Sequence, residues 1–315
     1  MPYESDGAPD RVSTSPPGIL AVVVIFESAA VIDRCLDSLL EAAPQRGIEV
    51  RVVDNGSSDD GAARASARLG ERAVIRMPVN RGFAAGVNAG LANAGSDWLA
   101  VVNPDLCFAP GALDALAAFL EGHPRAGVAG PRVDDAEGRR EETAGVFPSS
   151  RREWVHAWML DRVLPVQGRH RVQPMSAERV DWISGCAWLL RRAAWEAVGS
   201  LDEGYFMYFE DVDYCRRMAE SGWEVWSNPA VRATHARGTG SRATATLPAD
   251  GGAAAVRYLR KHLRPADRAP SVAALRSGWA LRLAVRRGLA ALGHPASRAI
   301  AERFRLALET SSRTK

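Results

Sequence analysis

The sequence contains few cysteines, and their spacing excludes two common uses of that residue. Cys35, Cys107, Cys186 and Cys215 lie far apart, and no CxxC pair occurs. Zinc sites and dithiol redox motifs require closely spaced cysteines, whereas disulfide frameworks are typical of small secreted chains. We therefore expect reduced thiols, no structural zinc and a cytoplasmic location.

Long apolar segments are absent as well. Residues 1–17 are polar and rich in Pro and Gly, and they lack the apolar core of a signal peptide, so we expect a disordered lead there. The apolar run at 19–26 is far shorter than the roughly 20 residues that a membrane-spanning helix needs. The sequence thus predicts a chain without a membrane span.

Two glycine-rich phosphate-binding patterns are also missing. No GxGxxG follows the first predicted strand, which argues against a dinucleotide-binding fingerprint, and no GxxxxGK followed by Ser or Thr occurs. What is present is the composition of an ordinary globular protein, with 47% apolar and 24% charged residues.

Positive charge is concentrated at one end of the chain. The formal net charge is only +3, but residues 251–315 contain 14 Lys and Arg against 3 Asp and Glu. Residues 1–250 contain 26 basic and 34 acidic side chains, so an acidic body carries a basic C-terminal end. This asymmetry favours an anionic surface or partner.

The first part of the sequence alternates between predicted strands and helices. The run ILAVVVIF (19–26) is continuously apolar and mostly β-branched, as in a strand buried on both faces of a parallel sheet. The alternation predicts an α/β fold with a mainly parallel sheet. The other elements predicted here are strands at 48–54, 72–77 and 97–103 and helices at 29–43, 59–69, 82–94 and 110–121.

The second part is less regular and ends in helices. Residues 133–178 are rich in Arg, Gly and Pro, and they predict irregular structure with one helix at 152–160. We predict an α/β domain over residues 18–242 and a basic helical extension over 243–315. The remaining predicted elements are strands at 180–183, 187–191 and 224–227 and helices at 192–198, 250–263, 275–291 and 296–309.

Polar motifs stand where predicted strands end. DNGSS (54–58) follows the second strand, NPD (103–105) follows the fourth, and NRGFAAGVN (80–88) opens a helix. Ligands of open α/β sheets bind outside the carboxyl ends of the strands. The free N–H groups of a helix start, with an arginine beside them, suit a phosphate. DNGSS and NPD are also ordinary turn sequences, so each motif alone is ambiguous.

The motif FMYFEDVDYC (206–215) places three carboxylates, Glu210, Asp211 and Asp213, directly behind aromatic residues. Apolar surroundings disfavour charge and raise the pKa of a carboxyl group. Carboxylates also favour the first turn of a helix, and apolar residues follow this motif at helical spacing. The motif alone leaves a structural and a catalytic interpretation open.

Taken in order, these motifs resemble those of the family 2 glycosyltransferases. After DNGSS, NRGFAAGVNAG and NPD come SGCAWLLRR (184–192), VGSLDEGYFMYFEDVDYCRRMAESGW (198–223) and NPAVRATH, which ends at His235. The resemblance covers residues 18–242, and it is strongest to bacterial rhamnosyltransferases of cell-wall and surface-polysaccharide assembly. It implies a GT-A catalytic domain and an inverting enzyme that uses a nucleotide sugar.

The resemblance assigns the donor-binding residues. Asp54 matches the acid that contacts the nucleotide base or ribose, and Asn55 lies beside it. Asn80, Arg81 and Gly82 match the segment near the nucleotide and its diphosphate.

A divalent metal, Mg²⁺ or Mn²⁺, is also implied. Asp105 matches the last acid of the family's DxD metal motif, and His235 matches a histidine that joins the metal shell in related enzymes. Asn103, a further donor-site residue, replaces the first acid of that motif and leaves one carboxylate fewer for the metal. Leu201 stands where the family usually has Phe, which we interpret as a packing change.

Asp211 matches the catalytic base, which would accept the proton of the attacking hydroxyl. Glu210 would bind acceptor or sugar hydroxyls, and Asp213 would support its helix. A single carboxylate acting opposite the leaving group fits inversion by one displacement. Trp182 is the candidate for stacking on an acceptor sugar, although tryptophans such as Trp154, Trp158, Trp182 and Trp188 are more often core residues. We interpret His156, His170, His262 and His294 as surface or packing residues.

The expected reaction is transfer of L-rhamnose from dTDP-rhamnose to a saccharide or a polyprenyl-diphosphate-linked acceptor. The same fold with a UDP- or GDP-sugar donor is one alternative. A non-catalytic protein that binds sugar nucleotides or lipids is an alternative of another class.

The basic helices interleave arginines with apolar residues that include Trp279, Leu283 and Phe304. They are compatible with a helix pair packed on the domain, or with peripheral binding to an anionic membrane at the inner face of the plasma membrane. We expect the membrane contact, since a polyprenyl acceptor is anchored there, and we expect no nucleic-acid partner. Homodimer formation is left open.

Overall fold

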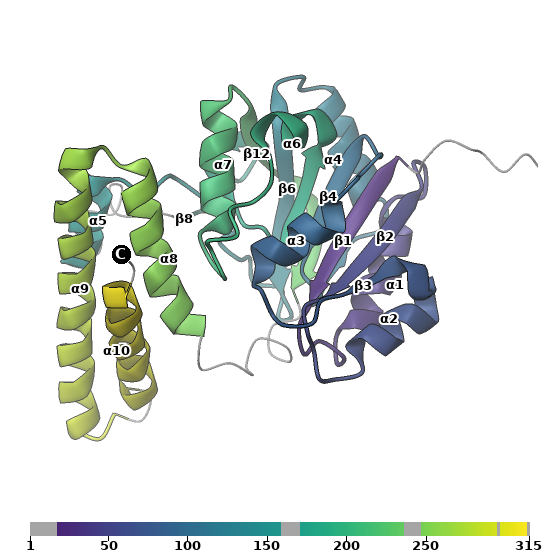
Figure 1. Cartoon of the computed structure of the whole chain (residues 1–315). Coiled ribbons are helices and arrows are strands. Elements are labelled where there is room, and N and C mark those ends of the chain that lie inside the picture. Colours follow the sequence, from purple (N-terminus) through teal and green to yellow (C-terminus); the bar gives the residue numbers. More distant parts are fainter. Residues whose placement is uncertain (1–17, 159–170, 236–246, 295–296, 314–315) are drawn as a thin grey trace, which may run out of the picture.

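The computed structural model describes residues 18–158, 171–235, 247–294 and 297–313. The predicted disordered lead at 1–17 lies outside these residues. A twisted α/β body and a helical bundle stand side by side (Figure 1). The predicted fold class is confirmed, with a mostly parallel central sheet and C-terminal helices.

The central sheet of the described residues has nine strands, in the order β3-β2-β1-β4-β11-β6-β12-β5 with β9 paired to β12. The neighbours β3, β2, β1 and β4 run parallel, whereas β11 is antiparallel to both β4 and β6. Strand β1 is buried along its whole length, as its β-branched run predicts. The strands are β1 (Ile19–Ile25), β2 (Ile48–Asp54), β3 (Val74–Arg76), β4 (Trp98–Val102), β5 (Leu106–Phe108), β6 (Ala126–Asp135), β9 (Glu178–Val180), β11 (Ala187–Arg191) and β12 (Glu224–His235).

Helices cover both faces of the sheet and create two cores. One core joins α1, α2 and α4 to the sheet, and the other joins α3, α6 and α7 to its opposite face. Two apolar layers around a sheet are what an α/β sequence must build to bury its strands. The helices are α1 (Ile32–Ala42), α2 (Gly61–Leu69), α3 (Phe83–Leu91), α4 (Ala112–Glu121), α6 (Arg192–Val198) and α7 (Glu210–Glu220), and a short 3₁₀ helix, η1, spans Glu71–Ala73.

Several strands of the structure were not predicted from the sequence. The sequence of β6, AGVAGPRVDD, contains Gly, Pro and Asp, which are depleted in strands, yet β6 is a central strand between β11 and β12. The predicted strand at 224–227 continues to His235 as β12, and β5 pairs with its end. A separate small sheet has the order β10-β7-β8 and uses β7 (Ala144–Gly145), β8 (Arg171–Val172) and β10 (Trp182–Ile183).

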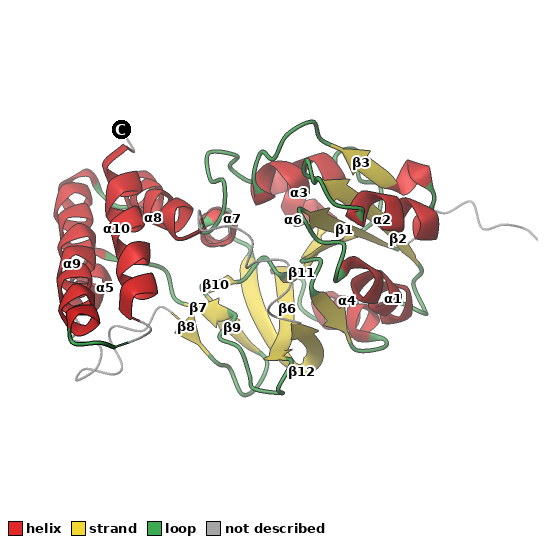
Figure 2. Cartoon of the chain, turned by 90° about the horizontal axis from the view of Figure 1, so that it is seen from below, coloured by secondary structure: helices red, strands yellow, loops and turns green. Residues whose placement is uncertain are grey.

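The C-terminal helices form a bundle that also includes a helix from the α/β domain. Helix α5 (Ser150–Ala157) packs on α9 (Pro265–Ala291), and Arg282 donates to the Ala157 carbonyl at 3.1 Å. Helices α8 (Leu247–His262) and α10 (Ser297–Arg313) complete the bundle (Figure 2). Within the described residues, no helix is both long and apolar enough to cross a membrane.

Candidate active site

The DNGSS and NRG segments form one unit beyond the carboxyl ends of β1 and β2. Asp54, the last residue of β2, is buried and accepts a hydrogen bond from the backbone N–H of Ser57 at 3.0 Å. The side chain of Asn55 donates to Asn80 Oδ1 and to the Gly82 carbonyl, both at 3.0 Å. These contacts bring the first group of predicted donor-site residues together.

Arg81 and Gly82 extend this unit toward the acidic motif. Asn55 Oδ1 accepts from the Arg81 backbone N–H at 3.0 Å, while the Arg81 guanidinium pairs with Glu203 at 2.7 Å. Gly82 has a φ of +89°, and a Cβ at this position would lie 2.3 Å from the Phe206 carbonyl oxygen. Only glycine permits this approach between the two segments. The pairing of Glu203 with Arg81 was not predicted from the sequence.

Asp105 and His235 meet across the sheet although 130 positions separate them. His235 Nε2 lies 2.9 Å from Asp105 Oδ1, and its Nδ1 lies 3.2 Å from Glu141 Oε2. Burial alone would lower the pKa of His235, but the adjacent carboxylates of Asp105 and Glu141 raise it above its ordinary value. Asn103 precedes Asp105 by two residues, and its backbone N–H donates to the Cys186 carbonyl at 2.9 Å.

The donors at this position fit a divalent cation. Carboxylate oxygen and imidazole nitrogen suit Mn²⁺, and Mg²⁺ is held by one or two carboxylates plus substrate phosphates. The part of the chain that the structure describes contains no cluster of three or more His, Cys, Asp or Glu side chains arranged for a metal. Asp105 and His235 are two such side chains, fewer than a complete metal shell requires.

Glu210 and Asp211 open helix α7, as the first-turn interpretation predicts. Asp211 accepts hydrogen bonds from the backbone N–H groups of Gly185 at 3.2 Å and Val212 at 2.8 Å. Gly185 also faces the ring of Phe83, at the start of α3. The carboxylate that we predict to be the base is thus held by the backbone of Gly185 and by the first turn of its own helix.

Glu210 occupies a different environment from Asp211. It is buried, and its Oε2 atom has no hydrogen-bond partner among the described residues. Burial, together with the charge of Asp211, raises the pKa of Glu210 well above its ordinary value. Of the two neighbouring carboxyls, Glu210 is the one that the fold favours in its protonated form.

Trp182 lies in the interior. Its side chain is only 5% exposed, and its indole N–H donates to the Val146 carbonyl at 3.1 Å. No open ring face is offered to a sugar, so this geometry supports the core interpretation of Trp182 and not the stacking one. Phe206 and Tyr208 of the acidic motif are the exposed aromatic side chains beside the site, at 39% and 44%.

One edge of the sheet brings together two linked loops, a carboxylate–histidine pair and a separately held carboxylate. This arrangement suits transfer from a nucleotide sugar. The sequence profile described as "Glycosyl transferase family 2" matches residues 20–198, which is more than half of the chain. The chain therefore belongs to glycosyltransferase family 2, and it is a glycosyltransferase.

Two relatives of known name are rhamnosyltransferases. The chain is 33% identical over 230 residues to the "N-acetylglucosaminyl-diphospho-decaprenol L-rhamnosyltransferase" of Mycobacterium tuberculosis (strain ATCC 25618 / H37Rv), covering 68% of this chain and 74% of the relative. It is 41% identical over 56 residues to "Rhamnosyltransferase WbbL" of Escherichia coli (strain K12), covering 18% and 21% of the two chains.

Solved structures share the fold. The mannosyltransferase PcManGT from Pyrobaculum calidifontis, in complex with GDP-Man and Mn²⁺, aligns with a TM-score of 0.57 at 18% identity and covers 99% of this chain and 90% of its own. S. aureus TarS 1-349 in complex with UDP-GlcNAc aligns with a TM-score of 0.54 at 16% identity and covers 93% and 90%. These likenesses establish the GT-A fold.

Proposed function

We propose that this chain transfers L-rhamnose from dTDP-rhamnose, with inversion, to a saccharide carried on a polyprenyl diphosphate. The observation that carries the proposal is the 33% identity over 230 residues to a rhamnosyltransferase whose name specifies a diphospho-decaprenol acceptor. The site geometry supports the same reaction, since the segments matched to the donor and the proposed base converge at one edge of the sheet.

The donor would lie across the linked DNGSS and NRG segments. Asp54 and Asn55 would contact the nucleoside, while Asn80, Arg81 and Gly82 would lie near the diphosphate. Arg81 can exchange its contact with Glu203 for a phosphate, because the Arg81 side chain is more than half exposed. Asp105 and His235, with Asn103 beside them, would hold Mg²⁺ or Mn²⁺, which when bound offsets the negative charge that develops on the leaving diphosphate.

Asp211 would act as the general base. Its side chain accepts hydrogen bonds from two backbone N–H groups, and these aim the group from the start of α7. The acceptor hydroxyl would pass its proton to Asp211 as its oxygen attacks the anomeric carbon and the bond to the diphosphate breaks. Glu210, when protonated, could donate a hydrogen bond to a sugar hydroxyl.

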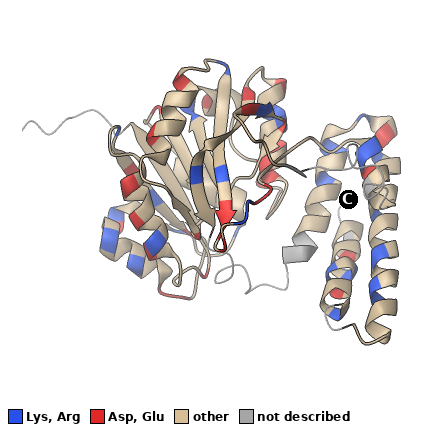
Figure 3. Cartoon of the chain, turned by 180° about the vertical axis from the view of Figure 1, so that it is seen from behind, with Lys and Arg blue, Asp and Glu red and all other residues tan. Residues whose placement is uncertain are grey.

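A peripheral contact with an anionic membrane is part of the proposal. We define the basic tip of the bundle as Val285, Arg287, Leu292, Arg298 and Arg303, which are all exposed at the far ends of α9 and α10. Arginines, coloured blue in Figure 3, recur along these two helices. Leu292 is 85% exposed, and an apolar side chain among arginines suits an interface of lipid headgroups. Trp279, by contrast, packs against the second core.

The test is a donor panel. Purified protein should be stabilised against thermal unfolding by dTDP-rhamnose more than by UDP- or GDP-sugars, since ligand binding to the folded state raises its apparent stability. Transfer should then be measured from the same donors to a polyprenyl-diphosphate N-acetylglucosamine. Transfer from a UDP- or GDP-sugar but not from dTDP-rhamnose would contradict the proposed donor and leave the family assignment intact.

A further inference from the structure

Helix α8 of the bundle packs along the turn that leads into the acidic motif. The ring of Tyr208 lies against α8 at Gly251, with 3.5 Å between its Cδ2 atom and the position of a Cβ there. The ring of Phe209 contacts Tyr258, at 5.5 Å between centroids. Helix α8 thus contacts both residues that immediately precede Glu210.

Those two residues have an unusual backbone. Tyr208 and Phe209 have φ values of 69° and 65°, in the left-handed region that side chains other than glycine rarely adopt. No side chain caps the start of α7. Each such residue costs on the order of 1 kcal/mol or more, and it persists only where the surrounding structure holds it. Contacts from outside α7 must therefore fix the direction in which the helix begins.

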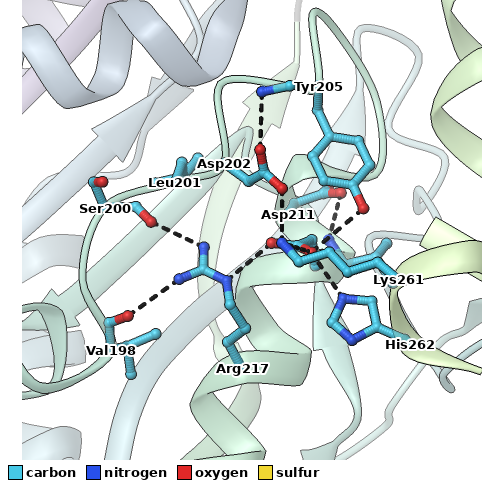
Figure 4. A network of polar contacts seen from close by, with 12 residues as sticks. Val198, Ser200, Leu201, Asp202, Tyr205, Asp211, Arg217, Lys261 and His262 are labelled. Carbon is cyan, nitrogen blue, oxygen red and sulfur yellow. Dashed lines mark hydrogen bonds and ion pairs between the residues drawn. The ribbon is translucent and has the colours of Figure 1, made fainter. Parts of the chain in front are cut away.

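The end of α8 provides such contacts through Asp213. Lys261 Nζ and His262 Nε2 each lie 2.7 Å from Asp213 Oδ1, and the Tyr205 hydroxyl donates to the same oxygen at 3.3 Å (Figure 4). Arg217, one turn further along α7, donates to Asp213 Oδ2 at 2.9 Å. Asp213 is fully buried, so these partners replace the water that its carboxylate has lost.

Charge balance supports this description. Burial alone would raise the pKa of Asp213, but the hydrogen bonds from His262, Lys261 and Arg217 hold it well below its ordinary value. Loss of one partner would leave a buried charge with fewer compensating contacts. The first turn of α7 therefore depends on side chains that belong to the C-terminal bundle.

Helix α8 also holds the loop that precedes α7, residues 199–209. Arg257 and Lys261 both contact Asp202, at 2.8 Å and 2.7 Å. This loop also reaches the donor side of the site, where Glu203 pairs with Arg81 and the Phe206 carbonyl accepts from the Phe83 N–H at 2.9 Å. One loop therefore connects α8, the NRG segment and the helix that bears Asp211.

We propose that α8 is a positioning element for the catalytic base, and that Lys261 and His262 perform this role by holding Asp213. The inference rests on the proposed role of Asp211, which lies two residues before Asp213 in the same turn. It places part of the active site's support in a helix beyond the residues that match the family profile. The simpler alternative is that the ion cluster only adds stability to the interface.

The first experiment does not depend on activity. The Asp213 N–H donates to the Phe209 carbonyl at 2.8 Å, so hydrogen–deuterium exchange over residues 199–213 reports on the turn and on the start of α7. Two variants, Lys261→Met and His262→Leu, remove a hydrogen-bond donor to Asp213. Their exchange is compared with that of Lys261→Arg and His262→Gln, which each keep a donor. Arg264→Met is the control, because Arg264 is exposed and pairs with Asp267 instead.

Exchange over 199–213 should accelerate in Lys261→Met and His262→Leu, while peptides from β1 and β4 remain unchanged. The conservative variants and Arg264→Met should resemble the wild type. Equal exchange in all variants, or acceleration across the whole protein, would overturn the proposal whether or not the chain transfers rhamnose.

The second experiment measures transfer. Misplacement of a reacting group by about 1 Å can cost roughly 100-fold in rate, so kcat should fall about 10- to 100-fold in Lys261→Met and His262→Leu. Donor affinity should change far less, and Lys261→Arg and His262→Gln should recover most of kcat. A loss of activity that only tracks the folded fraction would favour the stability alternative. Absence of transfer by the wild type would contradict the proposed function alone.

Discussion

At the scale of single residues, the two neighbouring carboxyls of the acidic motif have different environments and should respond differently to substitution. Asp211→Asn keeps the shape of the side chain and abolishes proton acceptance. We expect kcat to fall at least about 100-fold, the usual lower size of a general-base effect, with donor affinity nearly unchanged. Steady-state kinetics and donor titration check this, with the exposed Asp33→Asn on α1 as the control. Near-normal turnover would remove Asp211 from the role.

Glu210 offers a test by pH. Because the pKa of Glu210 is raised above its ordinary value of 4.5 in the folded state, its contribution to stability is complete below that pH. The contribution is lost as the pH rises through the folded-state pKa. Glu210→Gln cannot ionise, so its melting temperature relative to the wild type should increase as the pH rises from 4.5.

Melting curves of both proteins across this range measure the difference. Glu220→Gln, at the exposed end of the same helix, is the matched control and should show no such trend. A constant difference between Glu210→Gln and the wild type at every pH would show that burial does not shift this carboxyl.

At the scale of elements, the close approach of Gly82 to the Phe206 carbonyl can be tested by substituting Gly82 and a control glycine, Gly70. Gly82 and Gly70 share a φ of +89°, but a Cβ on Gly82 would overlap the Phe206 carbonyl, whereas nothing lies within 4 Å of one on Gly70. Gly70→Ala measures the backbone cost alone, on the order of 1–3 kcal/mol. Gly82→Ala should destabilise folding by more and also weaken donor binding. Urea unfolding and donor titration separate these effects; equal losses would contradict the tight approach.

The metal site is also a matter of elements, since pairing of His235 with Leu106 across β12 and β5 brings His235 to Asp105. Asp105→Ala and His235→Ala should each weaken Mn²⁺ binding measured calorimetrically in the presence of dTDP, because each removes one donor. Cys107→Ala, a neighbour on β5, is the control. Full transfer activity in excess chelator would contradict the metal role and leave the leaving group to Arg81 and backbone N–H groups.

The sequence predicts those elements of the fold whose residues favour the observed local structure by themselves. Strand β1 and the motifs at strand ends were predictable, because β-branched runs and turn residues act locally. Strand β6 was not, since its Gly, Pro and Asp oppose strand formation and only pairing with β11 and β12 compensates. The sequence also does not predict that Glu141, Glu203 and His262 contact site residues. Each of them meets its partner, His235, Arg81 or Asp213, only through the tertiary fold.

At the scale of the whole molecule, one part of the helical bundle packs on the α/β body and another part is exposed. The packing interpretation applies to the first part, and the membrane-binding interpretation applies to the second. Helix α8 and the start of α9 contribute side chains to the second core. Truncation of the bundle would therefore disturb the site itself, and it cannot separate membrane contact from stability. Substitutions at the basic tip, whose side chains are exposed, provide the cleaner test.

Arg287→Glu combined with Arg298→Glu should release the protein from anionic vesicles. Each arginine near such a surface contributes about 1 kcal/mol, so losing two should weaken binding at least about 30-fold. The melting temperature should not change, because both side chains are exposed. Arg72→Glu combined with Arg179→Glu makes the same charge change on the α/β body, where both arginines are also exposed, and serves as the control.

Flotation with vesicles of phosphatidylglycerol measures the binding. Transfer to a long-chain polyprenyl acceptor in such vesicles should fall with it, while transfer to a short, water-soluble analogue should persist, because the catalytic residues are untouched. Equal flotation of the tip variant and the control would contradict the membrane contact and leave the bundle as a support for the active site alone.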